Sequence, residues 1–183
     1  EVQNPADALS ELGWMRTAYD AEEMIISSKQ SPTGPQSEMA QKLAGAVGSL
    51  GIPVFLTGMA RGLLGRSHAL QMRHQRKKAL KNADLVILAG MPCDFRLGYG
   101  RSFGAGAGII SINRSKADLK LNCRPDLAVL SDPFLFLCAL ADVLAAESSG
   151  WGSWIQELKK NDDGREEFIS KTAREKTDLL NPL

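Results

Sequence analysis

Five consecutive apolar residues, Leu85-Val86-Ile87-Leu88-Ala89, decide the fold of this chain. A run of that length without a polar residue is typical of a β-strand that is buried on both faces. A basic segment with helical character, 69–83, precedes the run, and Gly90 follows it. Strands buried on both faces occur in parallel sheets that are covered by helices on either side. The stretch therefore predicts an α/β protein.

The same alternation of strand and helix extends to both sides of this run. Further short apolar or β-rich runs lie at 24–26, 52–56, 109–112 and 127–130. Helical patterns separate or follow them at 36–50, 69–83 and 134–146. Because uninterrupted apolar strands that alternate with helices are buried on both faces, we predict a parallel sheet with helices on both sides.

The two ends of the chain differ in character from its middle. We assign 1–22 to an N-terminal helix and linker, and 23–148 to a central α/β domain. The charged, amphipathic segment 149–183 predicts a peripheral helix and a linker to a domain that is missing from this chain. We expect Trp151 and Trp154 to pack against that missing neighbour, which would make this last segment dispensable for the sheet.

The composition excludes several classes of protein. The 183 residues include 22 Lys and Arg against 21 Asp and Glu, and 44% are hydrophobic, as in an ordinary globular domain. A nearly neutral chain argues against nucleic acid as a partner, because domains that track phosphates are usually strongly basic. No apolar run approaches the roughly 20 residues that span a bilayer, so we expect no membrane span in this segment. Three cysteines without metal-binding spacing argue against a disulfide framework and indicate an intracellular, reducing compartment.

Small and polar residues follow the ends of the predicted strands. In an open parallel sheet, ligands bind beyond the carboxyl ends of the strands, where backbone N–H groups meet anions. The candidate cofactor-binding residues are therefore Ser28, Gly58, Met59, Gly90, Arg96, Asn113, Arg114, Ser131 and Asp132. Neither a GxGxxG motif nor a Walker loop is present, so the alternative that these are ordinary strand-to-helix turns stays open.

Several other features have both a structural and a functional interpretation, and the structural one is favoured for each. The glycines between Gly98 and Gly108 are more typical of a flexible crossover loop than of close approach to a ligand. Cys93 beside Asp94 has no identifiable base, so a half-buried structural thiol is favoured over a nucleophile. His68 and His74 lie six residues apart, which does not fit a shared metal site on one helix. We predict no catalytic residue and no metal ligand in this chain.

A basic cluster precedes the deciding strand. It offers either a phosphate-binding patch or the solvated face of a helix, and the second interpretation is favoured because no aromatic residues interleave. Its members are Arg61, Arg66, Arg73, Arg76, Lys77, Lys78 and Lys81.

Beyond these patterns, the sequence resembles a known family over residues 50–144. The resemblance is carried by Gly51-Ile52-Pro53-Val54, by 58–65 (GMARGLLG), by His68, by 79–86 (ALKNADLV) and by 90–96 (GMPCDFR). These motifs are similar to the central domain of thiamine-diphosphate-dependent enzymes of the acetolactate synthase type. The runs 93–100 (CDFRLGYG) and Ile112-Asn113-Arg114 resemble the acetolactate-synthase-like branch that is assigned as 2-hydroxyacyl-CoA lyase.

The resemblance implies a six-stranded, Rossmann-like sheet of the sirtuin and deoxyhypusine synthase type. It places this domain between a pyrimidine-binding domain with the catalytic glutamate and a diphosphate-binding domain with the metal ligands. The parent would be a homo-oligomeric lyase or synthase that uses thiamine diphosphate and Mg²⁺, and this chain alone would be inactive. The central domain would give structural support and hold a degenerate nucleotide or CoA site, since many relatives bind FAD or ADP there. An anchor in the endoplasmic reticulum membrane, outside this chain, is left open for the parent.

The sequence leaves two other classes of function open. One is an independent nucleotide-binding or sirtuin-like NAD module, and the other is an interaction module without a ligand. A sirtuin usually carries a four-cysteine zinc site, which the three cysteines of this chain do not supply.

Two departures from the family pattern predict weak nucleotide binding. Relatives have Gly-x-Arg where this chain has Gly90-Met91-Pro92, and many have an Asp for the ribose where it has Asn113. Pro92 donates no hydrogen bond, and neutral Asn113 is a weaker acceptor than a carboxylate. Arg96 and Arg114 are the residues available to compensate for the missing charge.

We therefore expect ADP and FAD to bind this chain with Kd values above roughly 100 µM. Each hydrogen bond to a charged group contributes about 1.5–3 kcal/mol, so losing two costs roughly 3–6 kcal/mol, or about two to four decades in affinity. Calorimetry with ADP, FAD and CoA checks this, beside the double variant Pro92→Arg and Asn113→Asp, which should bind ADP more tightly. Low-micromolar binding by the unmodified chain, or a nucleotide retained through purification, would contradict the prediction.

Overall fold

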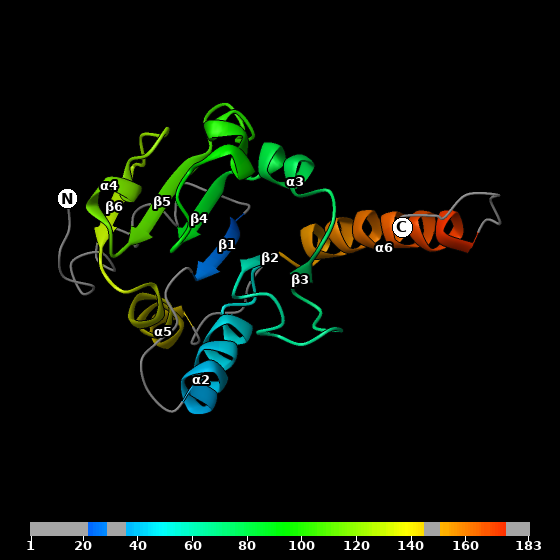
Figure 1. The fold of residues 1–183 in the computed structure, drawn as a ribbon, viewed down its shortest axis with the longest axis horizontal. Helices are drawn as coiled ribbons and strands as arrows, with labels where there is room; N and C mark the ends of the chain where they lie inside the picture. Colours follow the sequence, from blue (N-terminus) through cyan, green and yellow to red (C-terminus); the bar gives the residue numbers. More distant parts are fainter. Residues whose placement is uncertain (1–21, 29–35, 145–150, 175–183) are drawn as a thin grey trace.

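A six-stranded parallel sheet forms the centre of the molecule (Figure 1). The computed structural model describes residues 22–28, 36–144 and 151–174. The strand order is β3-β2-β1-β4-β5-β6, and every neighbouring pair is parallel. This confirms the predicted α/β class and the Rossmann-like arrangement. The strands are β1 (Glu22–Ser28), β2 (Val54–Gly58), β3 (Gln71–Met72), β4 (Leu85–Ala89), β5 (Gly108–Asn113) and β6 (Leu127–Leu130).

Helices cover both faces of this sheet. On one face α2 (Gln36–Ser49) packs against α5 (Pro133–Leu144), and both contribute to one apolar cluster. The other face is covered by α3 (Arg76–Asn82), the 3₁₀ segment η1 (Phe95–Gly100) and the start of α6 (Gly152–Arg174). The short α4 (Lys116–Leu119) connects β5 to β6. None of these helices is long and apolar enough to cross a membrane within the described ranges.

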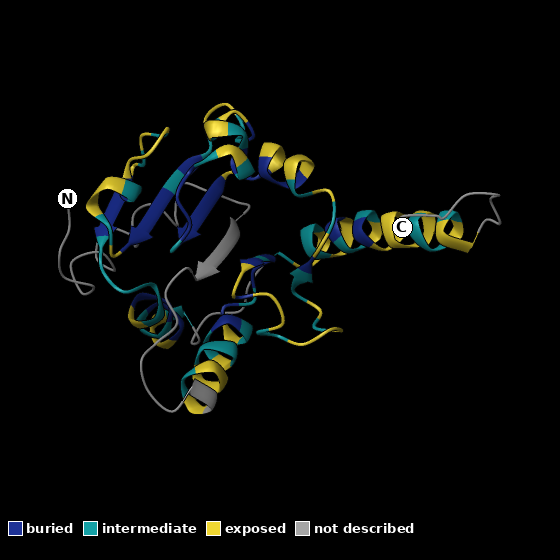
Figure 2. Cartoon of the chain, in the orientation of Figure 1, coloured by how far each residue is buried: buried dark blue, intermediate teal, exposed yellow. Residues whose placement is uncertain are grey.

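The central strand β4 alternates between the two apolar clusters. Leu85, Ile87 and Ala89 belong to the cluster under α2 and α5, whereas Val86 and Leu88 belong to the cluster under α3. Every side chain of the strand is at most 1% exposed, and Figure 2 shows the strand in dark blue. Burying one such side chain contributes about 1.5–3 kcal/mol, so both faces of the strand stabilise the fold.

The predicted helix over 69–83 is wrong in its first half. Val54 N donates to Leu70 O over 2.8 Å, and Met72 is 2% exposed, so this part of the chain forms the edge strand β3. The turn at Gln75, with φ of 56°, then lets α3 begin at Arg76. Leu70 and Met72 are two residues apart, which is the period of a strand. The basic residues that follow them made the segment look like one continuous helix, so this short strand pattern was missed. Similarly, β2 lies two residues beyond the predicted 52–56.

The N-terminal half of α6 packs on this domain. Trp151 contacts the cluster under α2 and α5, and Trp154 contacts the cluster under α3. Leu158 is 6% exposed within that second cluster. The expectation that both tryptophans pack only against a missing neighbour is therefore wrong. Figure 2 shows that most of the helix beyond Asp162 is exposed, so the peripheral character belongs to that part. Residues 1–21 and 175–183 lie outside the described ranges, so the predicted N-terminal helix and final linker are not described.

A buried carboxylate ties α6 to the edge of the sheet. Asp162 Oδ1 accepts hydrogen bonds from the backbone N–H groups of Arg73 at 2.7 Å and His74 at 2.5 Å, just after β3. The residue is 5% exposed. Two exposed contacts flank it, from Lys78 Nζ to Asn161 Oδ1 at 3.1 Å and from His74 Nε2 to Glu166 Oε2 at 2.8 Å. The end of β3 thus obtains its hydrogen-bond acceptor from a helix almost 90 residues later in the chain.

Replacing Asp162 with Ala should lower the free energy of unfolding by about 2–4 kcal/mol, because two backbone donors lose a charged acceptor. Urea denaturation measures the change. The matched control is Asp163→Ala, since Asp163 is exposed and its contact among the described residues is a 3.6 Å ion pair with Lys159. That variant should change stability by no more than about 0.5 kcal/mol. Equal effects of the two substitutions would show that Asp162 does not anchor the helix.

Candidate functional site

The predicted site residues lie along the carboxyl edge of the sheet, but they do not converge on one point. Ser28 pairs with Gly58 in the register of β1 and β2, and nothing is described of the Ser28 side chain. Met59 follows Gly58 and is 72% exposed. Gly90 N donates to Ile112 O over 2.8 Å and so continues the sheet. The five remaining residues divide between the end of β5 and β6 and the loop after β4.

At the end of β5, the Asn113 side chain is used within its own loop. It is 8% exposed, and its Oδ1 accepts from Ser115 N at 3.0 Å. Ser115 Oγ in turn accepts from Asp118 N at 3.3 Å and caps α4. The amide oxygen that would face a ribose therefore already holds the turn into α4.

The charged residues of this corner also pair with each other. The Arg114 guanidinium forms an ion pair with the Asp132 carboxylate. Asp132 Oδ1 accepts from Phe134 N at 2.8 Å, which caps the start of α5. Ser131 N donates to Asn113 O at 3.1 Å and links the two loops. The geometry of Asn113, Arg114, Ser131 and Asp132 thus matches the alternative interpretation, that of strand-to-helix turns.

After β4, Arg96 is held by Asp94. The guanidinium contacts both carboxylate oxygens, with Nε at 3.0 Å from Oδ1 and Nη2 at 2.7 Å from Oδ2. Hydrogen bonding and the negative charge of Asp94 raise the pKa of Arg96 above its ordinary value. Asp94 also accepts from Arg96 N at 2.9 Å and caps η1. Pro92, where the resemblance implied an arginine, is buried and comes just before this pair in the sequence.

An open cavity of about 760 Å³ lies beside Arg96, at the ends of β2 and β3. Its floor is apolar and consists of Phe55, Met72 and Leu80 from the cluster under α3. None of the described residues that line it is acidic. Five cationic side chains line it, and they are Arg61, Arg73, Arg76, Lys77 and Arg96.

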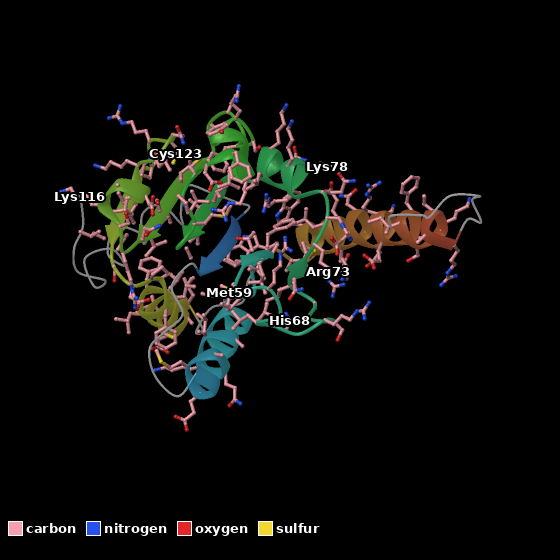
Figure 3. All side chains as sticks on the ribbon, in the orientation of Figure 1. Met59, His68, Arg73, Lys78, Lys116 and Cys123 are labelled. Carbon is pink, nitrogen blue, oxygen red and sulfur yellow. The ribbon has the colours of Figure 1, made fainter. Side chains whose placement is uncertain are left out.

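The sequence interpretation missed this cavity because it placed 69–83 on a single helix. The break at Gln75 instead puts Arg73 at the end of β3, and Arg76 and Lys77 on α3. Figure 3 shows Arg73 beside β3 and Lys78 on α3. The remaining members of the predicted basic cluster, Arg66, Lys78 and Lys81, are exposed and do not line the cavity, as expected for a solvated face. The sequence did contain a signal for this cavity, because cationic residues at 61 and at 73–77 follow the ends of two neighbouring strands.

The glycine-rich loop makes its closest approach to the protein itself. A Cβ atom on Gly104 would lie 2.7 Å from Lys81 O, which only a glycine allows. Gly104 N donates to Leu80 O at 3.1 Å at the same place. The glycine at 104 is therefore required by packing of the crossover against α3.

Cys93 is a buried thiol whose partner is a second thiol. It is 1% exposed, and it is hydrogen-bonded to Cys123, which Figure 3 shows near α4. Asn122 Nδ2 donates to Cys93 O at 3.0 Å and joins the two loops. The hydrogen bond to Cys123 and burial raise the pKa of Cys93, whereas the same bond lowers the pKa of Cys123. These contacts support the structural interpretation of Cys93, with fuller burial than expected.

The two histidines are separate. His68 Nδ1 accepts from Leu70 N at 3.3 Å, while His74 pairs with Glu166. Among residues 22–28, 36–144 and 151–174, no three His, Cys, Asp or Glu side chains gather closely enough to hold a metal ion.

Comparison with known proteins identifies the fold family. The family model described as "Thiamine pyrophosphate enzyme, central domain" matches residues 34–140. The chain belongs to this family. The central domain is also 40% identical over 166 residues to human 2-hydroxyacyl-CoA lyase 2, covering 87% of this chain and 26% of that protein. It is 39% identical over 108 residues to the large subunit of acetolactate synthase from Mycobacterium tuberculosis, covering 58% of this chain and 19% of that protein.

A solved structure gives the same fold at low sequence identity. Benzoylformate decarboxylase from Polynucleobacter necessarius aligns with a TM-score of 0.55 at 15% identity, over 82% of this chain and 29% of that chain. This central domain spans about a quarter of the length of the lyase that it resembles. The resemblance stated from the sequence motifs is therefore confirmed at the level of the family.

The described residues of this central domain do not fit thiamine diphosphate and its magnesium ion. A metal–diphosphate group needs carboxylate or amide oxygens, and no acidic cluster of that kind is present in the described ranges. The cavity beside Arg96 offers cations in place of metal ligands. No catalytic step through the cofactor is therefore assigned to this chain.

The thiol pair predicts a graded reactivity of the three cysteines. Because thiolates are the reactive form, iodoacetamide should alkylate Cys123, whose pKa is lowered, faster than Cys138, whose pKa is raised by burial. Cys93 should react slowest, and mass spectrometry after timed quenching measures all three rates. Cys93→Ala should slow the reaction of Cys123, whereas Cys138→Ala should leave it unchanged. Equal rates for Cys123 and Cys138 in the folded chain would contradict the prediction.

Proposed function

We propose that this chain is the non-catalytic central domain of a larger, thiamine-diphosphate-dependent enzyme that cleaves 2-hydroxyacyl-CoA thioesters. The observation that carries this proposal is the 40% identity to human 2-hydroxyacyl-CoA lyase 2 over 87% of the chain. The domain covers only 26% of that protein, so flanking domains would supply the remaining functions.

The contacts within the site support a scaffolding role. The turns after β5 and β6 use their polar side chains to hold the turn into α4 and to cap α5, which supports the proposal of a degenerate nucleotide site at that corner. Asp94 and Arg96 neutralise each other in the same way after β4. These residues fix loop geometry at the edge of the sheet, where neighbouring domains and subunits of a homo-oligomer would dock.

In the parent enzyme, thiamine diphosphate would act as the electron sink for breaking a C–C bond next to a carbonyl group. The catalytic glutamate and the ligands for Mg²⁺ would come from the pyrimidine- and diphosphate-binding domains. We place the parent in an intracellular, reducing compartment, which the three free cysteines support.

An acetolactate synthase is the second candidate, and the 39% identity over 108 residues to the mycobacterial enzyme supports it. The shorter match, which covers 58% of this chain, makes it the weaker of the two. An independent sirtuin-like NAD module is disfavoured, because the family match is to a domain of a multidomain enzyme.

The 183-residue chain should release no aldehyde from a 2-hydroxyacyl-CoA, even when thiamine diphosphate and Mg²⁺ are supplied. The product of the full-length gene should release aldehyde under the same conditions, because its flanking domains activate the cofactor. A coupled aldehyde assay compares the two proteins, with carboligation of pyruvate as a parallel assay. Saturable activity of the chain alone would overturn its non-catalytic role, and a full-length protein that uses only pyruvate would favour the acetolactate synthase alternative.

A further inference from the structure

The cationic cavity beside Arg96 has more positive charge than the described protein neutralises. Asp94 offsets Arg96, and Arg76 Nη2 donates to Arg96 O at 2.6 Å. Arg73 donates to Arg66 O, and the pKa of the nearby Glu166 carboxyl is lowered chiefly by His74 and also by Arg73. Arg61 and Lys77 are exposed, and neither pairs with an acidic side chain in the described part of the chain. Like charges that converge on one open cavity repel each other unless an anion binds between them.

A buried acceptor in the same cavity also lacks a partner. Gln71 Oε1, at the start of β3, is shielded from solvent and accepts no hydrogen bond among the described residues. A buried polar atom of this kind costs stability until a donor reaches it. Ionised phosphate oxygens do not donate, so a ligand that pairs with Gln71 Oε1 would carry N–H or O–H groups, as a base and a ribose do.

An exposed aromatic ring lies at the rim. Phe95 is 69% exposed, and the Arg96 guanidinium carbon lies 5.9 Å from its ring centroid. Exposed rings beside cations are the usual stacking surface for nucleotide bases. The volume of about 760 Å³ also falls within the range of pockets that hold ligands of nucleotide size.

We infer that this cavity binds the 3′-phosphorylated adenosine diphosphate end of coenzyme A. Arg61, Arg73 and Lys77 meet the phosphates, Phe95 stacks on the base, and Gln71 accepts from an amino or hydroxyl group. The choice of coenzyme A rests on the proposed function, because a 2-hydroxyacyl-CoA lyase must bind the coenzyme A part of its substrate. The site lies at the ends of β2 and β3 and includes Arg96 from the predicted cofactor-binding residues, whereas Asn113, Arg114, Ser131 and Asp132 lie at the β5–β6 corner.

Charge explains why coenzyme A is preferred to simpler nucleotides. Its diphosphate and its 3′-phosphate together carry about four negative charges at neutral pH, since the second pKa of a phosphate ester is about 6. Dephospho-CoA is the same molecule without the 3′-phosphate and keeps two of these charges. A site built from several cations therefore distinguishes the two by electrostatics rather than by shape.

Calorimetry on the 183-residue chain with coenzyme A and dephospho-CoA tests the inference. Coenzyme A should bind about tenfold more tightly than dephospho-CoA, as expected for one additional charged contact. The double variant Arg61→Gln and Lys77→Gln should weaken coenzyme A binding by about tenfold or more and reduce the difference between the two ligands. The matched control is Arg66→Gln with Lys81→Gln, which removes two exposed cations that do not line the cavity. It should change neither affinity.

Two further variants separate the phosphates from the base. Phe95→Ala and Gln71→Leu should weaken both nucleotide ligands but leave the affinity for inorganic pyrophosphate unchanged. Absence of coenzyme A binding would overturn the inference, as would an equal loss in the control variant. Tighter binding of a single-stranded RNA oligonucleotide, dependent on Arg61 and Lys77, would also overturn it and indicate a nucleic-acid surface.

The full-length enzyme separates this inference from the proposed function. Lyase activity with an unchanged KM for 2-hydroxyacyl-CoA in the Arg61→Gln, Lys77→Gln variant would overturn the cavity assignment alone. Phosphate-dependent coenzyme A binding by a full-length protein without lyase activity would support the cavity and overturn the proposed function alone. A raised KM with little change in kcat supports both.

Discussion

The central strand β4 must be buried from two sides at once, and the rest of the molecule is arranged to satisfy that requirement. Leu85, Ile87 and Ala89 need one apolar layer, while Val86 and Leu88 need another. A parallel neighbour on each edge supplies the backbone hydrogen bonds, and each crossover then places a helix on one face or the other. The carboxyl ends of all six strands lie at one edge as a result, and the candidate site residues follow them.

The charged side chains at the β5–β6 end of that edge are paired differently from those at the β2–β3 end. On the β5–β6 side, Asn113 accepts from the loop that leads into α4, and Asp132 pairs with Arg114 and caps α5. On the β2–β3 side, no described residue that lines the cavity is acidic, and a buried acceptor has no partner among the described residues. Satisfied polar groups stabilise a fold, whereas unsatisfied ones reduce stability and are retained where a ligand completes them. The asymmetry separates a structural corner from a binding one within a single sheet.

The fold could be predicted from the sequence because its signals are local. The run at 85–89 and the strands near 109–112 and 127–130 lie where the apolar pattern placed them. The edge strand β3 could not be predicted, since it consists of two residues whose pairing with β2 forms only in the folded sheet. The role of Asp162 was hidden for the same reason: a charged residue in an amphipathic segment looks solvated until β3 presents its N–H groups. The positions of most candidate residues beside strand ends followed from the strand pattern, but the pairing of Arg114 with Asp132, and of Asp94 with Arg96, depends on side-chain geometry.

The attachment of α6 also has a mechanical meaning. Beyond Asp162 the helix continues for 12 residues to Arg174, a rigid arm of about 18 Å. Its inner end is fixed by Asp162 to the backbone of Arg73, and Arg73 lines the cationic cavity. A tilt of this part of the helix would displace Asp162. Through the hydrogen bonds of Asp162, the tilt would also displace the end of the edge strand β3. A movement of the helix would then also change the shape of the cavity.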